Sequence, residues 1–186
     1  MDMTNTISNN GAAMIASLEE ATTLMAHVIH QSSKKSWDAC RLEARALTEE
    51  ADTLVDIGSV PPIPGAIQAL KTLTQHHVLI GIVTGDNRNR TQQQLKNWDL
   101  DSCIDVIVTA DDVRQQKPDP ESLNKALAAL QLDVSQAILV GDSINDWRMA
   151  EVIGMPMVAI GKTIDTPSDN IKANLPDLRS LVVLSH

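Results

Sequence analysis

The chain of 186 residues contains no phenylalanine, no tyrosine and only three tryptophans. Aromatic side chains normally supply a large share of a buried core, so we expect Met, Ile, Leu and Val to fill it here. The hydrophobic fraction of 43% and the charged fraction of 21% are typical of a soluble globular protein. This length favours one large domain, or one domain with a small accessory lobe.

Long apolar runs are also lacking, and cysteine is rare. No apolar run approaches the roughly 18–20 residues that cross a bilayer, and the chain does not open with a basic segment followed by an apolar one. Cys40 and Cys103 lie far apart, without a Cys-x-x-Cys pattern or a Cys/His cluster. We therefore expect two reduced thiols in a cytoplasmic protein that has no membrane partner.

Basic residues are outnumbered, which gives a formal charge of -9 and a pI near 4.9. A nucleic-acid partner is not expected, because neutralising phosphates requires a basic face. An acidic protein still binds a small phosphate ester where local cations or a metal reverse the field in the pocket. The sequence leaves the oligomeric state open.

Two stripes with helical spacing predict a helical hairpin before residue 59. The first, within 11–31, comprises Met14, Leu18, Ala21, Met25 and Val28; the second comprises Cys40, Ala44, Leu47, Ala51 and Leu54. Ser36 is the expected N-cap of the second helix, and Gly58 its expected end.

After VPPIPG (60–65), short apolar runs alternate with helical segments. Helices are expected at 65–75, 88–97, 120–131 and 145–153, and strands within 78–84, 104–110, 137–143 and 157–161. The segment 179–186 predicts one more short strand or helix. This alternation is typical of an α/β fold, a doubly wound parallel sheet with helices on both faces, in which ligands bind at the carboxyl ends of the strands.

Two of these strand ends carry groups that suit a phosphate. Thr84, Gly85 and Asp86 follow the first apolar run and precede a helix, where a hydroxyl and helix amides bind phosphate oxygens; the same residues are also common in turns and N-caps. Lys117 precedes a Pro-Asp-Pro turn that restricts the backbone beside it. A loop lysine is otherwise a solvated surface charge, so both interpretations of Lys117 stay open.

The third strand end is GDSIND, which places Asp142 directly after an apolar run and Asp146 four residues later. Two carboxylates on one turn suit a hard divalent cation such as Mg²⁺. The alternative is an N-capping Asp followed by an exposed helical Asp. A hydroxyl, a cation and an acid pair at neighbouring strand ends together stabilise a transferring phosphoryl group.

These motifs resemble, in order and spacing, the phosphoglycolate-phosphatase-like branch of the haloacid dehalogenase superfamily. The resemblance covers 60–161 and rests on PPIPGAIQALKTL, IGIVTGDN, IVTADDVRQQKPDPESLNKAL and ILVGDSINDWRMAEVIGMPMVAIG. It implies an α/β core over 60–186, a small α-helical cap over 11–59, and a remnant of the catalytic loop over 1–10. It also implies Mg²⁺ as cofactor and a small phosphorylated metabolite as substrate.

The first motif of that family, DxDGT or DxDNT, aligns with MDMTNTI at the start of the chain. The resemblance implies that Asp2 is the nucleophile and joins Asp142 and Asp146 at the metal, and that Thr84 and Lys117 hold the phosphoryl group. Thr4 stands where the family has its acid/base Asp. The apolar strand that precedes the motif in the family, between the strands ending at Thr84 and Asp142, is absent from this sequence.

Four interpretations follow. The first is a Mg²⁺-dependent phosphatase that works through an aspartyl-phosphate. The second, favoured by Thr4 and the absent strand, is a catalytically silent relative that binds a phosphate ligand or a partner. A phospho-receiver domain is disfavoured because the acidic pair follows the lysine. A 2-haloacid dehalogenase is disfavoured because GDSIND resembles a metal site.

Overall fold

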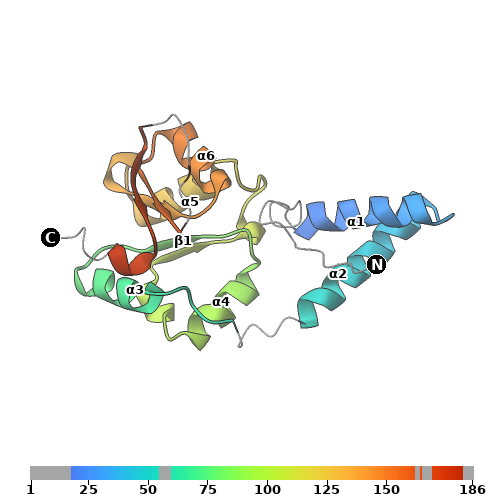
Figure 1. Cartoon of the computed structure of the whole chain (residues 1–186), viewed down its shortest axis with the longest axis horizontal. Helices are drawn as coiled ribbons and strands as arrows, with labels where there is room; N and C mark the ends of the chain where they lie inside the picture. Colours follow the sequence, from blue (N-terminus) through green and yellow to red (C-terminus); the bar gives the residue numbers. More distant parts are fainter. Residues whose placement is uncertain (1–17, 55–59, 162–163, 165–168, 182–186) are drawn as a thin grey trace. The chain divides into compact units, whose positions relative to one another are not determined.

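The computed structural model describes residues 18–54, 60–161, 164 and 169–181. The chain divides into two compact units, Met1–Asp56 and Ile57–His186, which are coloured along the sequence in Figure 1. Asp2, Thr4, Met14 and Gly58 lie outside the described residues.

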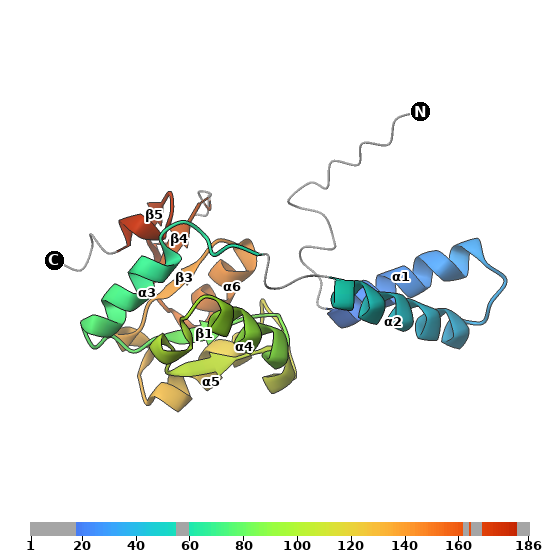
Figure 2. The same cartoon turned by 90° about the horizontal axis from the view of Figure 1, so that it is seen from below.

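The first unit is a pair of helices, α1 (Leu18–Ser32) and α2 (Trp37–Leu54), which lie side by side in both views (Figures 1 and 2). Ala26, Cys40 and Ala44 are fully buried between them, with Ile29 packed against this group. Small side chains at these positions let the two helices approach closely.

The seam of the hairpin differs from the predicted stripe on the first helix. Met25 and Val28 are 37% and 63% exposed, whereas Ala26 is buried. Successive helix residues are rotated by about 100°, so a seam through Ala26 turns Met25 toward the helix flank and Val28 toward the opposite face. On α2, Cys40 and Ala44 are buried as expected, but Leu47 is 44% exposed.

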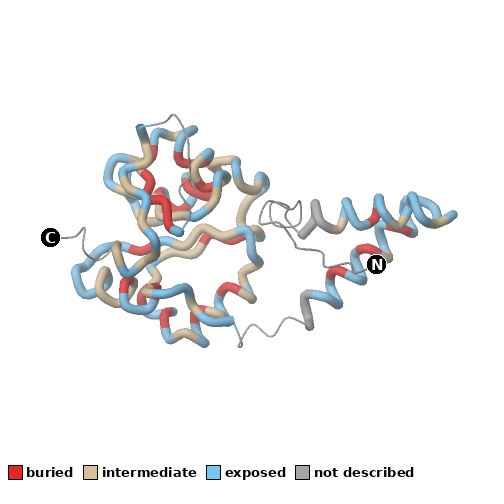
Figure 3. Tube along the Cα trace, viewed as in Figure 1, coloured by how far each residue is buried: buried red, intermediate tan, exposed pale blue. Residues whose placement is uncertain are grey.

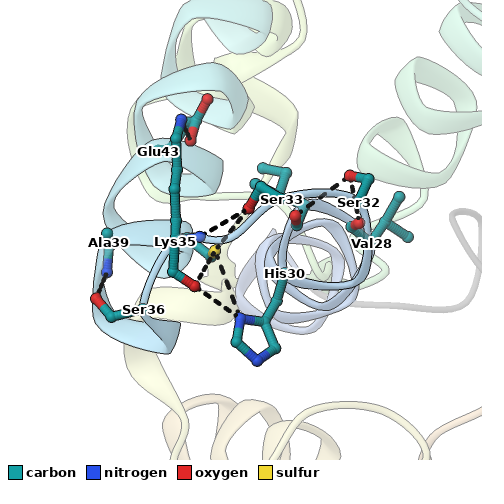
Figure 4. A network of polar contacts seen from close by, with 10 residues as sticks. Val28, His30, Ser32, Ser33, Lys35, Ser36, Ala39 and Glu43 are labelled. Carbon is teal, nitrogen blue, oxygen red and sulfur yellow. Dashed lines mark hydrogen bonds and ion pairs between the residues drawn. The ribbon is translucent and has the colours of Figure 1, made fainter.

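Polar contacts close the turn between the helices (Figure 4). The Ser32 hydroxyl donates to the Val28 carbonyl at 2.9 Å, and the His30 Nδ1 lies 3.1 Å from the Lys35 carbonyl oxygen. The Ser36 hydroxyl accepts from the Ala39 N–H at 3.4 Å. Because α2 begins at Trp37, Ser36 is the N-cap that the sequence predicts.

The second unit alternates helices and strands. Its helices are α3 (Ala66–Gln75), α4 (Arg88–Asn97), α5 (Glu121–Leu130) and α6 (Ile144–Ile153), and its strands are β1 (Gly81–Val83), β2 (Val106–Val108), β3 (Leu139–Gly141), β4 (Met157–Ile160) and β5 (Ile171–Leu175). Short 3₁₀ turns are η3 (Asp101–Cys103), η4 (Ala110–Asp112), η5 (Val134–Gln136) and η6 (Leu178–Ser180). The four helices and four strands predicted between 65 and 161 are confirmed, while β5 was not predicted. Residues 182–186 of the last predicted segment lie outside the described residues.

All strand pairs are parallel, which confirms the predicted α/β class. They form two sheets, one with the order β1-β2 and one with the order β3-β4-β5. Within the described residues no ladder joins β1 to β3, the two strands between which the family resemblance places the first strand. In Figure 1, α5 and α6 lie on one side of β1, and α3 and α4 on the other.

Burial follows this arrangement (Figure 3). All four residues of β4, which has neighbours on both edges, are buried, whereas β1 and β3 have no fully buried residue. The main core comprises Leu123, Leu127, Met149, Ala150, Met155 and Met157. Three methionines at its centre confirm that flexible aliphatic side chains take the place of aromatic ones. Val83 of β1 and Leu139 of β3 both pack against this core.

A smaller cluster of Leu95, Leu100 and Cys103 lies at the other sheet. Cys40 and Cys103 are both buried and free, as the sequence predicts. None of the helices in the described part of the chain is both long enough and apolar enough to cross a membrane.

Candidate functional site

The loop after β1 carries Thr84. Its N–H donates to the Val108 carbonyl at 3.0 Å and so continues the strand pairing. Its hydroxyl accepts from the Asp86 N–H at 3.1 Å, which leaves the hydroxyl proton available to a ligand. The N-cap of α4 is Asn87, whose side chain accepts from the Arg90 N–H at 2.8 Å. Turn, cap and candidate phosphate contact therefore coexist in this loop.

The other residues of this loop differ in what they offer. Gly85 is exposed, and no atom lies within 4 Å of where a side chain would begin. The Asp86 carboxylate forms a loose ion pair with Arg90 at 3.8 Å. Asp86 therefore presents negative charge beside the backbone that the sequence assigns to a phosphate.

The loop between β2 and α5 brings Lys117 to α6. The Lys117 Nζ lies 2.8 Å from the Asp146 Oδ1, and the two side chains are 25% and 8% exposed. The two residues are 29 positions apart in sequence. The lysine is therefore held by a buried carboxylate instead of extending into solvent.

Asp146 also begins α6. Its Oδ2 accepts from the Ser143 hydroxyl at 2.6 Å and from the Ser143 N–H at 3.2 Å, while the Ser143 hydroxyl accepts from the Asp146 N–H at 3.1 Å. This is a reciprocal capping box. The N-cap is thus Ser143 and not Asp142, which is exposed at the end of β3.

Gly141 is required by this geometry. A side-chain Cβ built at Gly141 would lie 2.8 Å from the Asp146 Cβ and 2.9 Å from its Cγ and Oδ2. Any larger residue would displace the carboxylate, so the glycine of GDSIND makes room for its second aspartate.

The structure brings together only part of the predicted site. Lys117 and Asp146 are in contact, while the Thr84 hydroxyl bonds to its own loop. In the described ranges no group of three or more His, Cys, Asp or Glu residues is placed to hold a metal ion. Asp2, the third predicted metal ligand, and Thr4 lie outside those ranges.

Sequence reasoning missed a set of charged residues around the Lys117 loop. The Asp112 Oδ2 accepts from Arg88 at 2.5 Å and from the N–H and hydroxyl of Thr109, each at 2.7 Å. The Arg88 guanidinium and the two Thr109 donors hold the pKa of Asp112 well below its usual range. A local signal existed in TADD, because Thr followed three residues later by Asp is typical of a capping box.

Glu121 and Lys125 complete this set and form an ion pair of 2.8 Å across one turn of α5. The bond from Lys125, followed by those from the Gln115 and Arg114 amides, lowers the pKa of Glu121 to about 2. Glu followed four residues later by Lys is a recognisable helical pair, but its reach to the loop amides is a tertiary feature.

The sequence profile of the haloacid dehalogenase-like hydrolases matches residues 3–160, a range that includes the loops after β1, β2 and β3. The chain belongs to the haloacid dehalogenase-like hydrolase family. This confirms the resemblance drawn from the sequence.

Three curated relatives illustrate the similarity. Pyrophosphatase PpaX of Halalkalibacterium halodurans is 33% identical over 130 residues, covering 66% of this chain and 60% of that protein. Validoxylamine A 7'-phosphate phosphatase of Streptomyces hygroscopicus is 34% identical over 112 residues, covering 60% and 53%. A plasmid-encoded phosphoglycolate phosphatase of Cupriavidus necator is 34% identical over 110 residues, covering 59% and 47%. The chain thus spans about half the length of the curated relatives it matches.

Solved structures of the family share the fold. A subfamily IA hydrolase of Geobacter sulfurreducens has a TM-score of 0.66 at 24% identity, over 89% of this chain and 72% of that one. A phosphatase of Thermococcus onnurineus has a TM-score of 0.59 at 22% identity, over 88% of both chains. At these identities the likeness supports the α/β fold alone.

Proposed function

We propose that the chain is a Mg²⁺-dependent phosphatase-type hydrolase that acts on a small phosphomonoester such as phosphoglycolate. The observation that carries the proposal is the 2.8 Å contact between Lys117 and Asp146. It places a fixed cation beside a buried carboxylate, at loops that follow parallel strands, where α/β proteins bind ligands. The three curated relatives, all phosphatases or pyrophosphatases, support the reaction class.

In this proposal the phosphoryl group is held by Thr84 and Lys117. The Thr84 hydroxyl keeps a proton to donate, and the open space beside Gly85 lets a phosphate oxygen approach the backbone. Asp86 contributes through its main chain only, because its carboxylate would repel the ligand. These groups stabilise charge on the transferring oxygens.

The Asp2 carboxylate attacks phosphorus and the P–O bond to the leaving alcohol breaks, which gives an aspartyl-phosphate. Water then attacks phosphorus, releases orthophosphate and regenerates Asp2. Thr4 neither donates a proton to the leaving alkoxide nor accepts one from the attacking water near neutral pH. Solvent supplies both transfers, so turnover is slower by about 10²–10⁴-fold than with a carboxylic acid there.

The donor chemistry fits Mg²⁺, which binds through one or two carboxylates and keeps several waters. Asp142 is exposed after β3 and has no hydrogen-bond partner among the described residues. Asp146 keeps one oxygen on Lys117 and the other on Ser143. Asp142 with Asp2 would hold the ion while Asp146 supports the site, and the ion would neutralise phosphoryl charge.

The test is release of phosphate from phosphoglycolate and from p-nitrophenyl phosphate, with MgCl₂ or with EDTA. Asp2→Asn is expected to abolish release, and Thr4→Asp to raise kcat by about 10²–10⁴-fold. Thr6→Asp is the matched control, because it adds the same charge two residues away. Halide release from 2-chloropropionate in EDTA would instead identify a dehalogenase.

A second candidate is a catalytically silent relative that binds a phosphate ligand without turnover, and Thr4 is the observation that favours it. Binding of orthophosphate without release by the unmodified chain, together with release by Thr4→Asp, would establish this candidate. Under both candidate functions we propose a cytoplasmic location, because both cysteines are buried and unpaired.

A further inference from the structure

The loop that carries Lys117 is tied to α5 by the carboxylate of Glu121. The Glu121 Oε2 accepts from the backbone N–H groups of Arg114 and Gln115, both at 2.9 Å. These amides belong to the loop, whereas Glu121 is the first residue of α5. One side chain therefore ties the middle of the loop to the helix that follows it.

The other oxygen of Glu121 binds a lysine that reaches the start of the same loop. The Glu121 Oε1 lies 2.8 Å from the Lys125 Nζ, and Lys125 also donates to the backbone carbonyl of Asp112. Glu121 and Lys125 thus connect α5 to three backbone groups of the loop, those of Asp112, Arg114 and Gln115. We call these two residues the loop clamp.

The start of the loop is anchored independently. Asp112 binds Arg88 at 2.5 Å, and Arg88 donates to the Ile107 carbonyl of β2 at 3.1 Å. The Gln116 side chain donates to the Ala110 carbonyl at 3.3 Å. The loop is therefore fixed to the sheet at one end and by the loop clamp in the middle.

Lys117 lies between two points that Glu121 fixes. It follows Gln115 by two residues, and the Asp119 Oδ1 accepts from the Glu121 N–H at 2.9 Å on the other side. The short arc from 116 to 120 has little freedom while both ends are held. The far end of Lys117 meets Asp146, which the capping box of α6 holds in turn.

We infer that Glu121 is a positioning residue, which sets where the Lys117 ammonium lies relative to Asp146. Under the proposed function, on which this consequence rests, Glu121 thereby aims Lys117 at the phosphoryl group. An exposed ion pair alone stabilises little. The two backbone amides on one charged acceptor distinguish Glu121 from such a pair, since charge-assisted bonds are about twice as strong as neutral ones.

The test measures how fast Lys117 reacts with trace acetic anhydride, read lysine by lysine by mass spectrometry. Glu121→Ala is expected to raise labelling of Lys117 by about tenfold, because loss of bonds to a charged acceptor shifts a local equilibrium by that order. Glu121→Gln retains an amide oxygen for the two N–H groups and is expected to restore most of the protection. A residue that merely stabilised the fold would give no such rescue.

The matched control is Asp99→Asn, which removes a surface ion pair of 3.0 Å with Lys71. The Asp99 φ is +53°, a conformation that Asn tolerates. It is expected to change labelling of Lys71 and not of Lys117. Urea unfolding of every variant verifies that labelling is compared between folded proteins.

Unchanged Lys117 labelling in folded Glu121→Ala, or an equal rise in Asp99→Asn, would overturn the inference. If Glu121→Ala fails to fold, Glu121→Asp keeps the charge at the start of α5 but shortens the side chain by one methylene, which takes its carboxylate away from the Arg114 and Gln115 N–H groups. Absence of a rise in Lys117 labelling in that variant would also overturn the inference. Labelling requires no turnover. A chain that releases no phosphate and binds no orthophosphate, yet shows the expected labelling, would refute the proposed function and leave the role of Glu121 supported.

Discussion

Replacing Gly141 by alanine tests whether the end of β3 is shaped around the second aspartate of GDSIND. The new methyl group would lie 2.8–2.9 Å from three atoms of Asp146. Carbon atoms in contact are normally about 3.5–4.0 Å apart, so Asp146 must move. Its carboxylate then loses the Ser143 cap, the Lys117 bond, or both.

The expected loss of stability has two sources. Overpacking of a close contact costs about 1–3 kcal/mol. Disruption of an N-cap costs about 0.5–2 kcal/mol. Partial relaxation of α6 keeps the two from adding in full, so Gly141→Ala is expected to lower the free energy of unfolding by roughly 2–4 kcal/mol.

Urea unfolding measures this difference, and Gly85→Ala is the control for stability. Gly85 has no positive φ, and nothing lies within 4 Å of its missing Cβ. Its replacement is expected to change the free energy of unfolding by less than about 0.5 kcal/mol. Ser143→Ala, made alone and with Gly141→Ala, completes a double-mutant cycle.

If the methyl group acts by displacing Asp146 from Ser143, the double variant loses less than the sum of the single variants, by about 1 kcal/mol. Additive losses would show that the clash is absorbed elsewhere. A Gly141→Ala protein within about 0.5 kcal/mol of the unmodified chain would refute the argument altogether.

Four further expectations concern other parts of the chain. Folding lowers the pKa of Glu121 from 4.5 to about 2, so its contribution to the free energy of unfolding is complete above pH 4.5 and is lost as the pH falls through 2. The difference in stability between the unmodified chain and Glu121→Gln, measured by urea unfolding, should therefore shrink between pH 4.5 and pH 2. A difference that stays constant over this range would contradict the argument. Asp112→Ala leaves Arg88 without its carboxylate and should cost about 1–3 kcal/mol in the same assay. Ala26→Leu should cost about 1–3 kcal/mol by overpacking the hairpin seam, whereas Val28→Lys should change stability by less than about 0.5 kcal/mol. Orthophosphate binding, measured by calorimetry, should weaken at least about tenfold in EDTA, and equal affinity with and without Mg²⁺ would contradict a metal-dependent attraction of the phosphate.

The helices of the second unit were predictable because their ends carry local signals. Asn87 caps α4, and Gly154 ends α6 with a φ of +69°. The strand β5 was missed because its alternation of Ile171, Ala173 and Leu175 is short and interrupted by polar residues. Only its parallel pairing with β4 defines it as a strand.

The hairpin seam shows a different limit. Hydrophobic periodicity favours the largest apolar side chains, so it selected Met25 and Val28 for the buried face. The first helix instead packs through Ala26, which is fully buried, against Ala44, which the sequence did place in the buried stripe. Small residues let the two helix backbones approach closely, which large side chains between them would prevent. Hydrophobic periodicity does not indicate where such small residues are needed.

The candidate site was predictable in its composition but not in its contacts. Lys117, Asp142 and Asp146 were selected because each lies near the carboxyl end of an apolar run. That Lys117 bonds to Asp146 depends on how the β2–α5 loop crosses toward α6, which Glu121 and Asp112 determine. Local patterns indicate only the Thr109–Asp112 cap and the Glu121–Lys125 pair. The bond of Asp112 to Arg88 and the bonds of the loop amides to Glu121 depend on the tertiary structure.

The pairing of Lys117 with Asp146 has a consequence for how an acidic protein attracts a phosphate ester. With a net charge of -9, the chain repels a dianion unless a local cation outweighs the surrounding carboxylates. Lys117 alone does not meet this need, because Asp146, 2.8 Å away, cancels its charge. Asp142 adds a further negative charge at the end of the neighbouring strand. Under the proposed function, a divalent cation on Asp142 would make the local potential positive, and the Lys117–Asp146 pair would then orient the ligand without being the source of attraction. The metal is therefore expected to govern binding as well as turnover, and the lysine to govern geometry.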